Sequence, residues 1–221
     1  MKRHQNSSNR SSFIFEILIF VLILFFIIIP PIFVSGLTEN STMFSWTFPW
    51  RQAGFCAFCI VLYFFTRKIL CSDKKIFYIS MLCLCLMLLV AIILKLIGTK
   101  TVTGSTISVQ LPQTAYEGLC CFLLFAFGAV YEEIIYRYYF VDTLKRILGF
   151  AGLENPKLLF VICEGLGLIL FACGHIYLGL FAVINAAFAH VILRILYKKT
   201  GLIWNGVLIH FIYNMISMIL L

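Results

Sequence analysis

The run Tyr116–Phe140 reads YEGLCCFLLFAFGAVYEEIIYRYYF. It is long enough to cross a lipid bilayer as a helix, which takes about 20 residues. Six other runs are similarly apolar: Phe13–Val34, Ala53–Thr66, Ile76–Ile97, Leu158–Gly174, Leu178–Tyr197 and Gly206–Leu221. The second and the last run are short for a full span. Lipid offers no hydrogen bonds, so spans outside closed barrels must be helices. The sequence therefore predicts an all-α, polytopic transmembrane bundle of about seven spans.

The composition leaves no room for a separate soluble domain. Hydrophobic residues make up 62% of the 221 positions and charged residues only 12%, against roughly half and a quarter in soluble domains. The net charge of +8 does not indicate nucleic acid, because the cations stand in short clusters between apolar runs. That distribution is typical of membrane orientation signals. The expected surroundings are a lipid bilayer, with no nucleic-acid partner.

The connections between the apolar runs alternate between many and few Lys and Arg residues. One set of connections carries twelve cations: Lys2, Arg3, Arg10, Arg67, Lys68, Lys74, Lys75, Lys145, Arg146, Lys157, Lys198 and Lys199. The other set carries two, Arg51 and Lys100. Cytoplasmic loops are enriched in Lys and Arg. We therefore expect a cytoplasmic N-terminal tail over 1–12 and a C-terminus on the opposite side.

Ionisable residues inside a span are costly and usually functional, and here they concentrate in the C-terminal half. Glu132 and Glu133 are adjacent, so on a helix they point about 100° apart. Glu133 and Arg137 stand at i, i+4 and are expected to pair. Glu132 is then left to face a cavity. The alternative is that all three lie at the membrane interface.

Two further clusters complete the set. His175 ends the fifth run, and His210 and Asn214 share one face of the last. Individually, His175 would be an interfacial residue, and His210 and Asn214 would join helices by hydrogen bonds. Together with Glu132 they permit two chemistries. In the first, the carboxylate and one imidazole activate water, while the second imidazole and the Asn214 amide stabilise an oxyanion. In the second, Glu132, His175 and His210 bind zinc. Both predict hydrolysis within the membrane.

The ordered motifs Glu132-Glu133-x-x-x-Arg137, Phe171-x-x-x-His175 and His210-x-x-x-Asn214 resemble those of the CPBP family. This family contains type II CAAX prenyl proteases and bacteriocin-processing (Abi) enzymes. The resemblance covers about 116–221. It departs from the family pattern where Tyr138 stands in place of a frequent glycine after the motif arginine.

The resemblance implies that Glu132 and His175 activate water, that His210 and Asn214 stabilise the oxyanion, and that Glu133 and Arg137 support the site. It leaves open whether zinc is bound or the mechanism is metal-free. It implies a membrane core over 111–221 preceded by N-terminal helices over 13–110. The expected location is a bacterial plasma membrane.

The leading hypothesis is therefore an intramembrane endopeptidase of a membrane-associated or prenylated, CAAX-like substrate. The alternatives are a non-catalytic bacteriocin immunity or binding protein on the same scaffold, and a small transporter. For the endopeptidase, Glu132 must reach the depth of the histidines, which a long helix tilted or kinked at Gly128 allows. Glu164 is expected to make contacts at the cytoplasmic side, and His190 to be a structural contact.

Overall fold

The computed structural model describes residues 2–33, 46–66, 76–101 and 111–220. Within these ranges every regular element is helical. The principal helices are α1 (Lys2–Ile23), α2 (Trp50–Thr66), α3 (Ile76–Thr101), α4 (Ala115–Glu132), α5 (Phe140–Phe150), α6 (Pro156–Cys173), α7 (Leu180–Thr200) and α8 (Ile203–Leu220). Short helical segments follow three of them: Leu24–Ile28 and Pro30–Phe33 after α1, Glu133–Tyr139 between α4 and α5, and Ile176–Leu178 after α6. The predicted all-α bundle is confirmed.

In the described ranges, five helices are long and apolar enough to cross a membrane: Phe13–Phe33, Ile76–Gly98, Ala115–Phe150, Pro156–Cys173 and Leu180–Thr200. Two shorter apolar helices, Trp50–Thr66 and Ile203–Ile219, accompany them. They correspond to the two runs that the sequence marks as short. The chain is an integral membrane protein.

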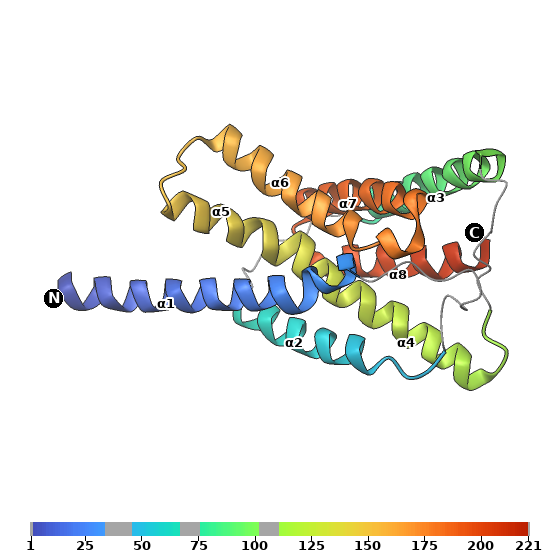
Figure 1. The fold of residues 1–221 in the computed structure, drawn as a ribbon, viewed down its shortest axis with the longest axis horizontal. Helices are drawn as coiled ribbons and strands as arrows, with labels where there is room; N and C mark the ends of the chain where they lie inside the picture. The colour runs from blue at the N-terminus through green and yellow to red at the C-terminus, as the bar shows by residue number, and fades with distance from the viewer. Residues whose placement is uncertain (1, 34–45, 67–75, 102–110, 221) are drawn as a thin grey trace.

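The helices lie roughly along the long axis of the molecule, and the two termini are at opposite ends (Figure 1). α2 packs on α4, α3 on both α7 and α8, and α6 on α7. The connection between α5 and α6 lies at the same end as the N-terminus (Figure 1). We call this the basic end, because the cations on α5, α6 and α7 gather there: Lys145, Arg146, Lys157, Lys198 and Lys199.

α4 and α5 form one long, interrupted span, Ala115–Phe150. The sequence allowed a tilt or a kink at Gly128, but the interruption lies after Gly128, in a π-helical turn over Glu133–Tyr139, here called the π-segment. π-turns of this kind are frequent at functional sites. The guanidinium of Arg194 on α7 donates a hydrogen bond to the carbonyl oxygen of Arg137 within the π-segment. The interruption therefore has a tertiary contact that the local sequence does not reveal.

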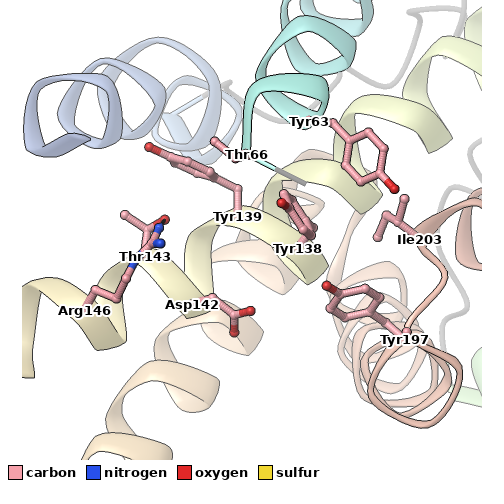
Figure 2. A pocket seen from close by; sticks show the side chains of 10 residues that line it. Tyr63, Thr66, Tyr138, Tyr139, Asp142, Thr143, Arg146, Tyr197 and Ile203 are labelled. Atoms are coloured by element: carbon pink, nitrogen blue, oxygen red, sulfur yellow. Dashed lines mark hydrogen bonds between the residues drawn. The ribbon is translucent and has the colours of Figure 1, made fainter. Parts of the chain in front are cut away.

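A pocket of about 190 Å³ lies on the basic-end side of the π-segment (Figure 2). Aromatic side chains from α2, the π-segment and α7 line it. We call it the tyrosine pocket; its lining is Tyr63, Thr66, Tyr138, Tyr139, Asp142, Thr143, Arg146, Tyr197, Gly201 and Ile203. Arg146, on α5, also pairs with Glu16 on α1. The pocket has both polar and aromatic lining side chains but contains no residue of the three sequence motifs.

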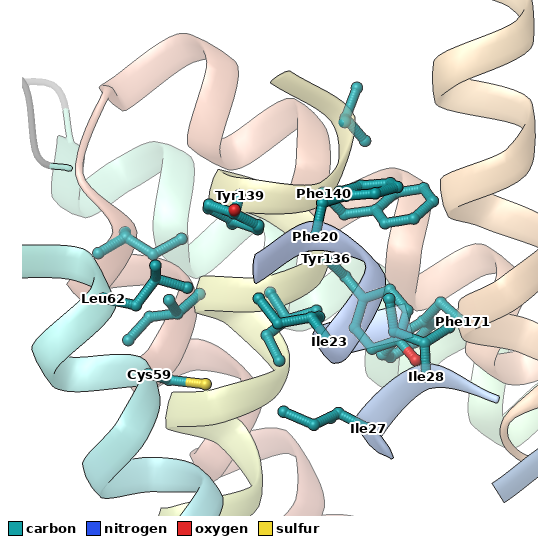
Figure 3. Close-up of a cluster of buried hydrophobic side chains, with 14 of the residues drawn as sticks. Phe20, Ile23, Ile27, Ile28, Cys59, Leu62, Tyr136, Tyr139, Phe140 and Phe171 are labelled. Atoms are coloured by element: carbon teal, nitrogen blue, oxygen red, sulfur yellow. The ribbon is translucent and has the colours of Figure 1, made fainter. Parts of the chain in front are cut away.

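The main hydrophobic core surrounds the π-segment (Figure 3). Phe20 of α1 stacks on Phe140, with 5.3 Å between the ring centroids. Cys59 and Leu62 enter from α2, and Phe171 enters from α6. A second cluster joins α3, α7 and α8. Close packing from α1, α2 and α6 fixes the position of the polar side chains that the π-segment carries into this core.

Candidate active site

The motif residues converge on a cavity of about 430 Å³. α4, α6 and α8 form its walls, and the ends of α1 and α2 contribute to its rim. The lining is Ile27, Pro31, Arg51, Gln52, Leu124, Phe125, Gly128, Tyr131, Glu132, Tyr136, Phe171, Gly174, His175, Tyr177, Leu178, His210 and Asn214. All four residues expected at the reaction centre, Glu132, His175, His210 and Asn214, are in this set.

Glu132 reaches the cavity because it lies near the middle of the long α4–α5 span. Its Oε2 atom is 3.8 Å from Nε2 of His210, so Glu132 lies at the depth of this histidine, as the endopeptidase hypothesis requires. Gly128 lies one turn earlier, inside the unbroken helix α4. A Cβ atom there would make only an ordinary contact, 4.0 Å from Oε1 of Glu132.

Glu133 points away from the cavity and is fully buried with Arg137. Its Oε1 is 3.4 Å from Nε of Arg137, which confirms the predicted i, i+4 pair. The same oxygen is 2.9 Å from Nδ1 of His210. Since an ionised carboxylate only accepts, Nδ1 donates, and Nε2 of His210 is turned toward Glu132. The contact between Glu133 and His210 was not predicted from the sequence.

The sequence reasoning also missed Gly206, which lies beside the buried carboxylate of Glu133. It stands one helical turn before His210 on α8, and a Cβ atom there would be 2.8 Å from Oε2 of Glu133. A real Cβ does not approach an oxygen so closely, so only glycine lets α8 approach the buried carboxylate. A glycine four residues before a motif histidine, in an otherwise apolar helix, is the signal that could have identified it.

His175 is held by the end of its own helix. α6 ends at Cys173, and Nδ1 of His175 is 2.9 Å from the carbonyl oxygen of Phe171. A carbonyl only accepts, so Nδ1 carries the proton and Nε2 presents a lone pair. The chain turns back into α7 through Gly179, whose φ of 93° is open to glycine. His175 is therefore oriented as a base on the cavity wall.

Phe171 organises the wall beneath the two histidines. The guanidinium carbon of Arg137 lies 4.0 Å from the centre of the Phe171 ring. The rings of Tyr136, His175 and His210 pack around it at 5.0, 4.9 and 6.4 Å. A cation over an aromatic face is favourable, more so away from water. Phe171, which begins the second motif, thus contacts residues of the other two motifs as well.

The family comparison agrees with this geometry. A model of the type II CAAX prenyl endopeptidase Rce1-like family matches residues 115–216, which contain all three motifs. Residues 115–216 are therefore similar to this family. No curated protein and no solved structure matches the chain. The motif residues that line the cavity all come from the segment that matches this family of CAAX-type intramembrane proteases.

A charged network lies outside the cavity, toward the basic end of the Rce1-like segment. As expected, Glu164 makes its contacts there: its carboxylate accepts from Lys145 at 3.2 Å, Lys198 at 2.5 Å and Nε of Arg194 at 2.9 Å. Arg194 also bonds Asp142 at 3.1 Å. This network connects α5, α6 and α7 to the π-segment through the Arg194 contact described above.

His190 is buried on α7 and does not line the cavity. Its ring packs 5.4 Å from that of Phe171. Neither of its nitrogens has a hydrogen-bond partner among the described residues. This placement fits the structural contact expected for it.

The expected zinc ligands need separate consideration. Chemically the donors suit the metal, because Nδ1 of each histidine is hydrogen-bonded and Nε2 is available, as in many zinc sites. Geometrically they do not form a ligand group: in the part of the chain that the structure describes, no three His, Cys, Asp or Glu side chains are arranged to hold a metal ion. The proposed reaction therefore uses Glu132, His175, His210 and Asn214 alone.

Proposed function

We propose that the protein is an intramembrane endopeptidase whose water nucleophile is activated by Glu132 and His175. The observation that carries the proposal is the convergence of four motif residues from three helices on one cavity. Apolar and aromatic side chains surround these polar groups, and the site lies within the helical bundle, so access of bulk water is restricted. Electrostatic interactions are stronger in such surroundings than in water.

In the first step, water held between Glu132 and His175 attacks the carbonyl carbon of the scissile peptide. The carboxylate of Glu132 takes the proton that leaves the water. Such base catalysis contributes about 10²–10⁴-fold to the rate. Nε2 of His175 accepts a hydrogen bond from the second water hydrogen, because its Nδ1 proton is held by the Phe171 carbonyl.

The tetrahedral intermediate carries a negative oxygen, for which His210 and Asn214 are the donors. Nδ1 of His210 donates to Glu133 at 2.9 Å, and Nε2 is 3.8 Å from Glu132. When Nε2 also carries a proton, it donates to the oxyanion beside the Asn214 amide. When the C–N bond breaks, Glu132 returns its proton to the leaving amine.

The substrate in this proposal is a membrane-associated peptide or protein, because the cavity is embedded among lipid-facing helices. A prenylated, CAAX-like C-terminus is the candidate that the family name provides. The proposed location is a bacterial plasma membrane, with the N-terminal tail cytoplasmic. A non-catalytic immunity or binding role is the alternative, and the test below separates the two.

The test is cleavage of membrane-anchored peptides by the purified, lipid-reconstituted protein. Glu132→Gln keeps the side-chain shape and removes the base, so we expect cleavage to fall about 10²–10⁴-fold. His175→Gln should also lower it strongly. Glu154→Gln, the same chemical change at an exposed position between α5 and α6, is the matched control and should leave cleavage unchanged.

Two other outcomes have defined meanings. Loss of wild-type cleavage in a chelator, with recovery on adding zinc, would assign Glu132, His175 and His210 to a metal site. Equal behaviour of wild type and Glu132→Gln on every peptide, with both protecting cells from a toxic peptide, would replace the protease proposal by the immunity role.

A further inference from the structure

The tyrosine pocket takes no part in the proposed reaction, and its two charged lining residues are opposite in sign. Asp142 and Arg146 stand at i, i+4 on α5, a spacing at which such side chains usually pair. Here Arg194 of α7 holds Asp142 at 3.1 Å, and Glu16 of α1 holds Arg146. Within the described ranges no ion pair joins Asp142 to Arg146. The pocket therefore presents an anion and a cation one helical turn apart, about 6 Å of rise.

Both charged side chains keep polar atoms for a ligand. The contacts of Arg146, with Glu16 and with Oγ1 of Thr143 at 3.1 Å, both use Nη2. A guanidinium carries further N–H donors on Nε and Nη1. The contact of Asp142 with Arg194 uses Oδ1, which leaves Oδ2. Because both side chains are exposed, an anionic group can reach Arg146 while a cationic group reaches Asp142.

Three tyrosine rings enclose the part of the pocket beside Asp142. Tyr138 of the π-segment stands between Tyr63 from α2 and Tyr197 from α7 (Figure 2), with 5.2 and 6.2 Å between the ring centroids. Both pairs meet edge to face, at 68° and 79°. Aromatic faces attract ammonium groups, and Tyr197 already has Arg194 at 5.7 Å. Tyr138 is also the residue at which the sequence departs from the family pattern, so this enclosure belongs to this chain.

The pocket lies where helices end, with apolar side chains beside it. α2 ends at Thr66 and α7 at Thr200, and phospholipid headgroups lie at the ends of membrane helices. Phe65 and Trp204 are exposed on α2 and α8, and the Trp204 ring is 5.7 Å from that of Tyr63. Tyrosines at this level often serve as interface anchors, but these three contact one another around a polar space. Phe65 and Trp204 can in turn contact an acyl chain.

We propose that the tyrosine pocket binds a zwitterionic headgroup, in which a phosphate and an ammonium are joined by a short chain. The phosphate contacts Arg146, and the ammonium contacts Oδ2 of Asp142 and the adjoining tyrosine rings. The apolar side chains beside the pocket favour a phospholipid as the source; a soluble phosphoamine has the same two charges. The pocket joins α2, α5 and α7, so its occupant stabilises the folded bundle. Binding here is independent of the proposed endopeptidase function.

Ligand specificity is tested by thermal unfolding of the full chain, purified in an uncharged maltoside detergent. Dihexanoyl phosphatidylethanolamine, at a few times its dissociation constant, should raise the Tm by about 2–4 °C. Dihexanoyl phosphatidylglycerol has the phosphate without the ammonium and should give a smaller shift. O-phosphoethanolamine has both charges without acyl chains. A response to phosphatidylethanolamine alone assigns a lipid source, and an equal response to O-phosphoethanolamine assigns a soluble one. Equal shifts with phosphatidylglycerol and phosphatidylethanolamine, or no shift with either ammonium compound, would overturn the proposal.

Three variants separate headgroup binding from the ion pairs of the fold. Arg146→Met removes the phosphate donor and the pair with Glu16, whereas Glu16→Gln removes the same pair and keeps the guanidinium. We expect Arg146→Met to lose the phosphatidylethanolamine shift and Glu16→Gln to retain it. Asp142→Asn keeps an oxygen for Arg194 and should lose the preference for phosphatidylethanolamine over phosphatidylglycerol. This variant also decides the matter if Arg146→Met does not fold. A wild-type response in Arg146→Met, a wild-type preference in Asp142→Asn, or loss of the shift in Glu16→Gln would each count against the site.

Discussion

At the scale of single residues, the adjacent glutamates have separate environments and therefore separate roles. Glu132 faces the cavity, whereas Glu133 is fully buried with Arg137 and His210. A buried charge costs several kcal/mol unless it is paired, and Glu133 has two partners. Its carboxylate fixes the ring of His210, and Arg137 in turn rests on Phe171. In the proposed mechanism, Glu133 thus positions the oxyanion donor, while Glu132 acts from the cavity wall as the base.

Gly206→Ala tests how closely this arrangement is packed. The new Cβ would lie 2.8 Å from Oε2 of Glu133, so the carboxylate must shift, and its other oxygen contacts both His210 and Arg137. We expect kcat/KM to fall about 100-fold, the cost of a misplacement of about 1 Å. Peptide cleavage by the reconstituted variant measures this.

Gly165→Ala is the matched control for that substitution. Gly165 is also helical, and a Cβ there has nothing within 4 Å. It should retain activity. Its free energy of unfolding should rise by about 0.4–1 kcal/mol, because alanine leaves the unfolded chain fewer conformations than glycine does. Wild-type cleavage by Gly206→Ala would show that α8 does not need its close approach to Glu133.

At the scale of elements, the π-segment connects the catalytic cavity with the charged network near the basic end. It begins at Glu133, directly after Glu132, and contains the Arg137 carbonyl that Arg194 binds. Arg194 also joins Glu164 and Asp142. α5, α6 and α7 therefore meet at the helical irregularity that orients both glutamates.

Arg194→Met should accordingly weaken both folding and catalysis. It leaves a buried carbonyl without its donor, which costs about 1–3 kcal/mol, and it removes a partner of Glu164. Lys198→Met is the control, because Lys198 binds the same carboxylate from an exposed position and such pairs contribute about 0–1 kcal/mol. Thermal unfolding in detergent and kcat measure the two effects. Equal losses in the two variants would contradict a role for Arg194 at the π-segment.

The elements also show how far sequence reasoning reaches. Apolar runs predicted the helices because lipid demands length and low polarity, properties that are local to each run. The π-segment was missed because Glu133–Tyr139 satisfies an α-helix equally well, and its distinguishing contact comes from Arg194 on α7. The His210–Glu133 contact spans 77 positions. The order of the motifs indicated the shared cavity, but interhelical packing alone determines which atoms meet.

At the scale of the whole molecule, the N-terminal helices do more than anchor the predicted core. The family match begins at residue 115, yet the cavity also uses Ile27, Pro31, Arg51 and Gln52 from α1, α2 and the segments beside them. The main core likewise includes Phe20 and Ile23 of α1 around the π-segment. In the proposed endopeptidase, the 111–221 region supplies the reacting residues, and the preceding helices complete the lining of the cavity.

Expressing the chain as two fragments, 1–105 and 106–221, tests whether both parts are needed for cleavage. Neither fragment alone should cleave a membrane-anchored peptide, because 106–221 lacks part of the rim and 1–105 lacks the motifs. Helices form individually in lipid before they associate, and each fragment keeps its own basic clusters to set its orientation. Co-expression should therefore restore cleavage, and a 106–221 fragment carrying Glu132→Gln should not restore it. Full activity of 106–221 alone would show that α1 and α2 are dispensable, whereas an inactive pair with both fragments in the membrane would show that the continuous chain is required.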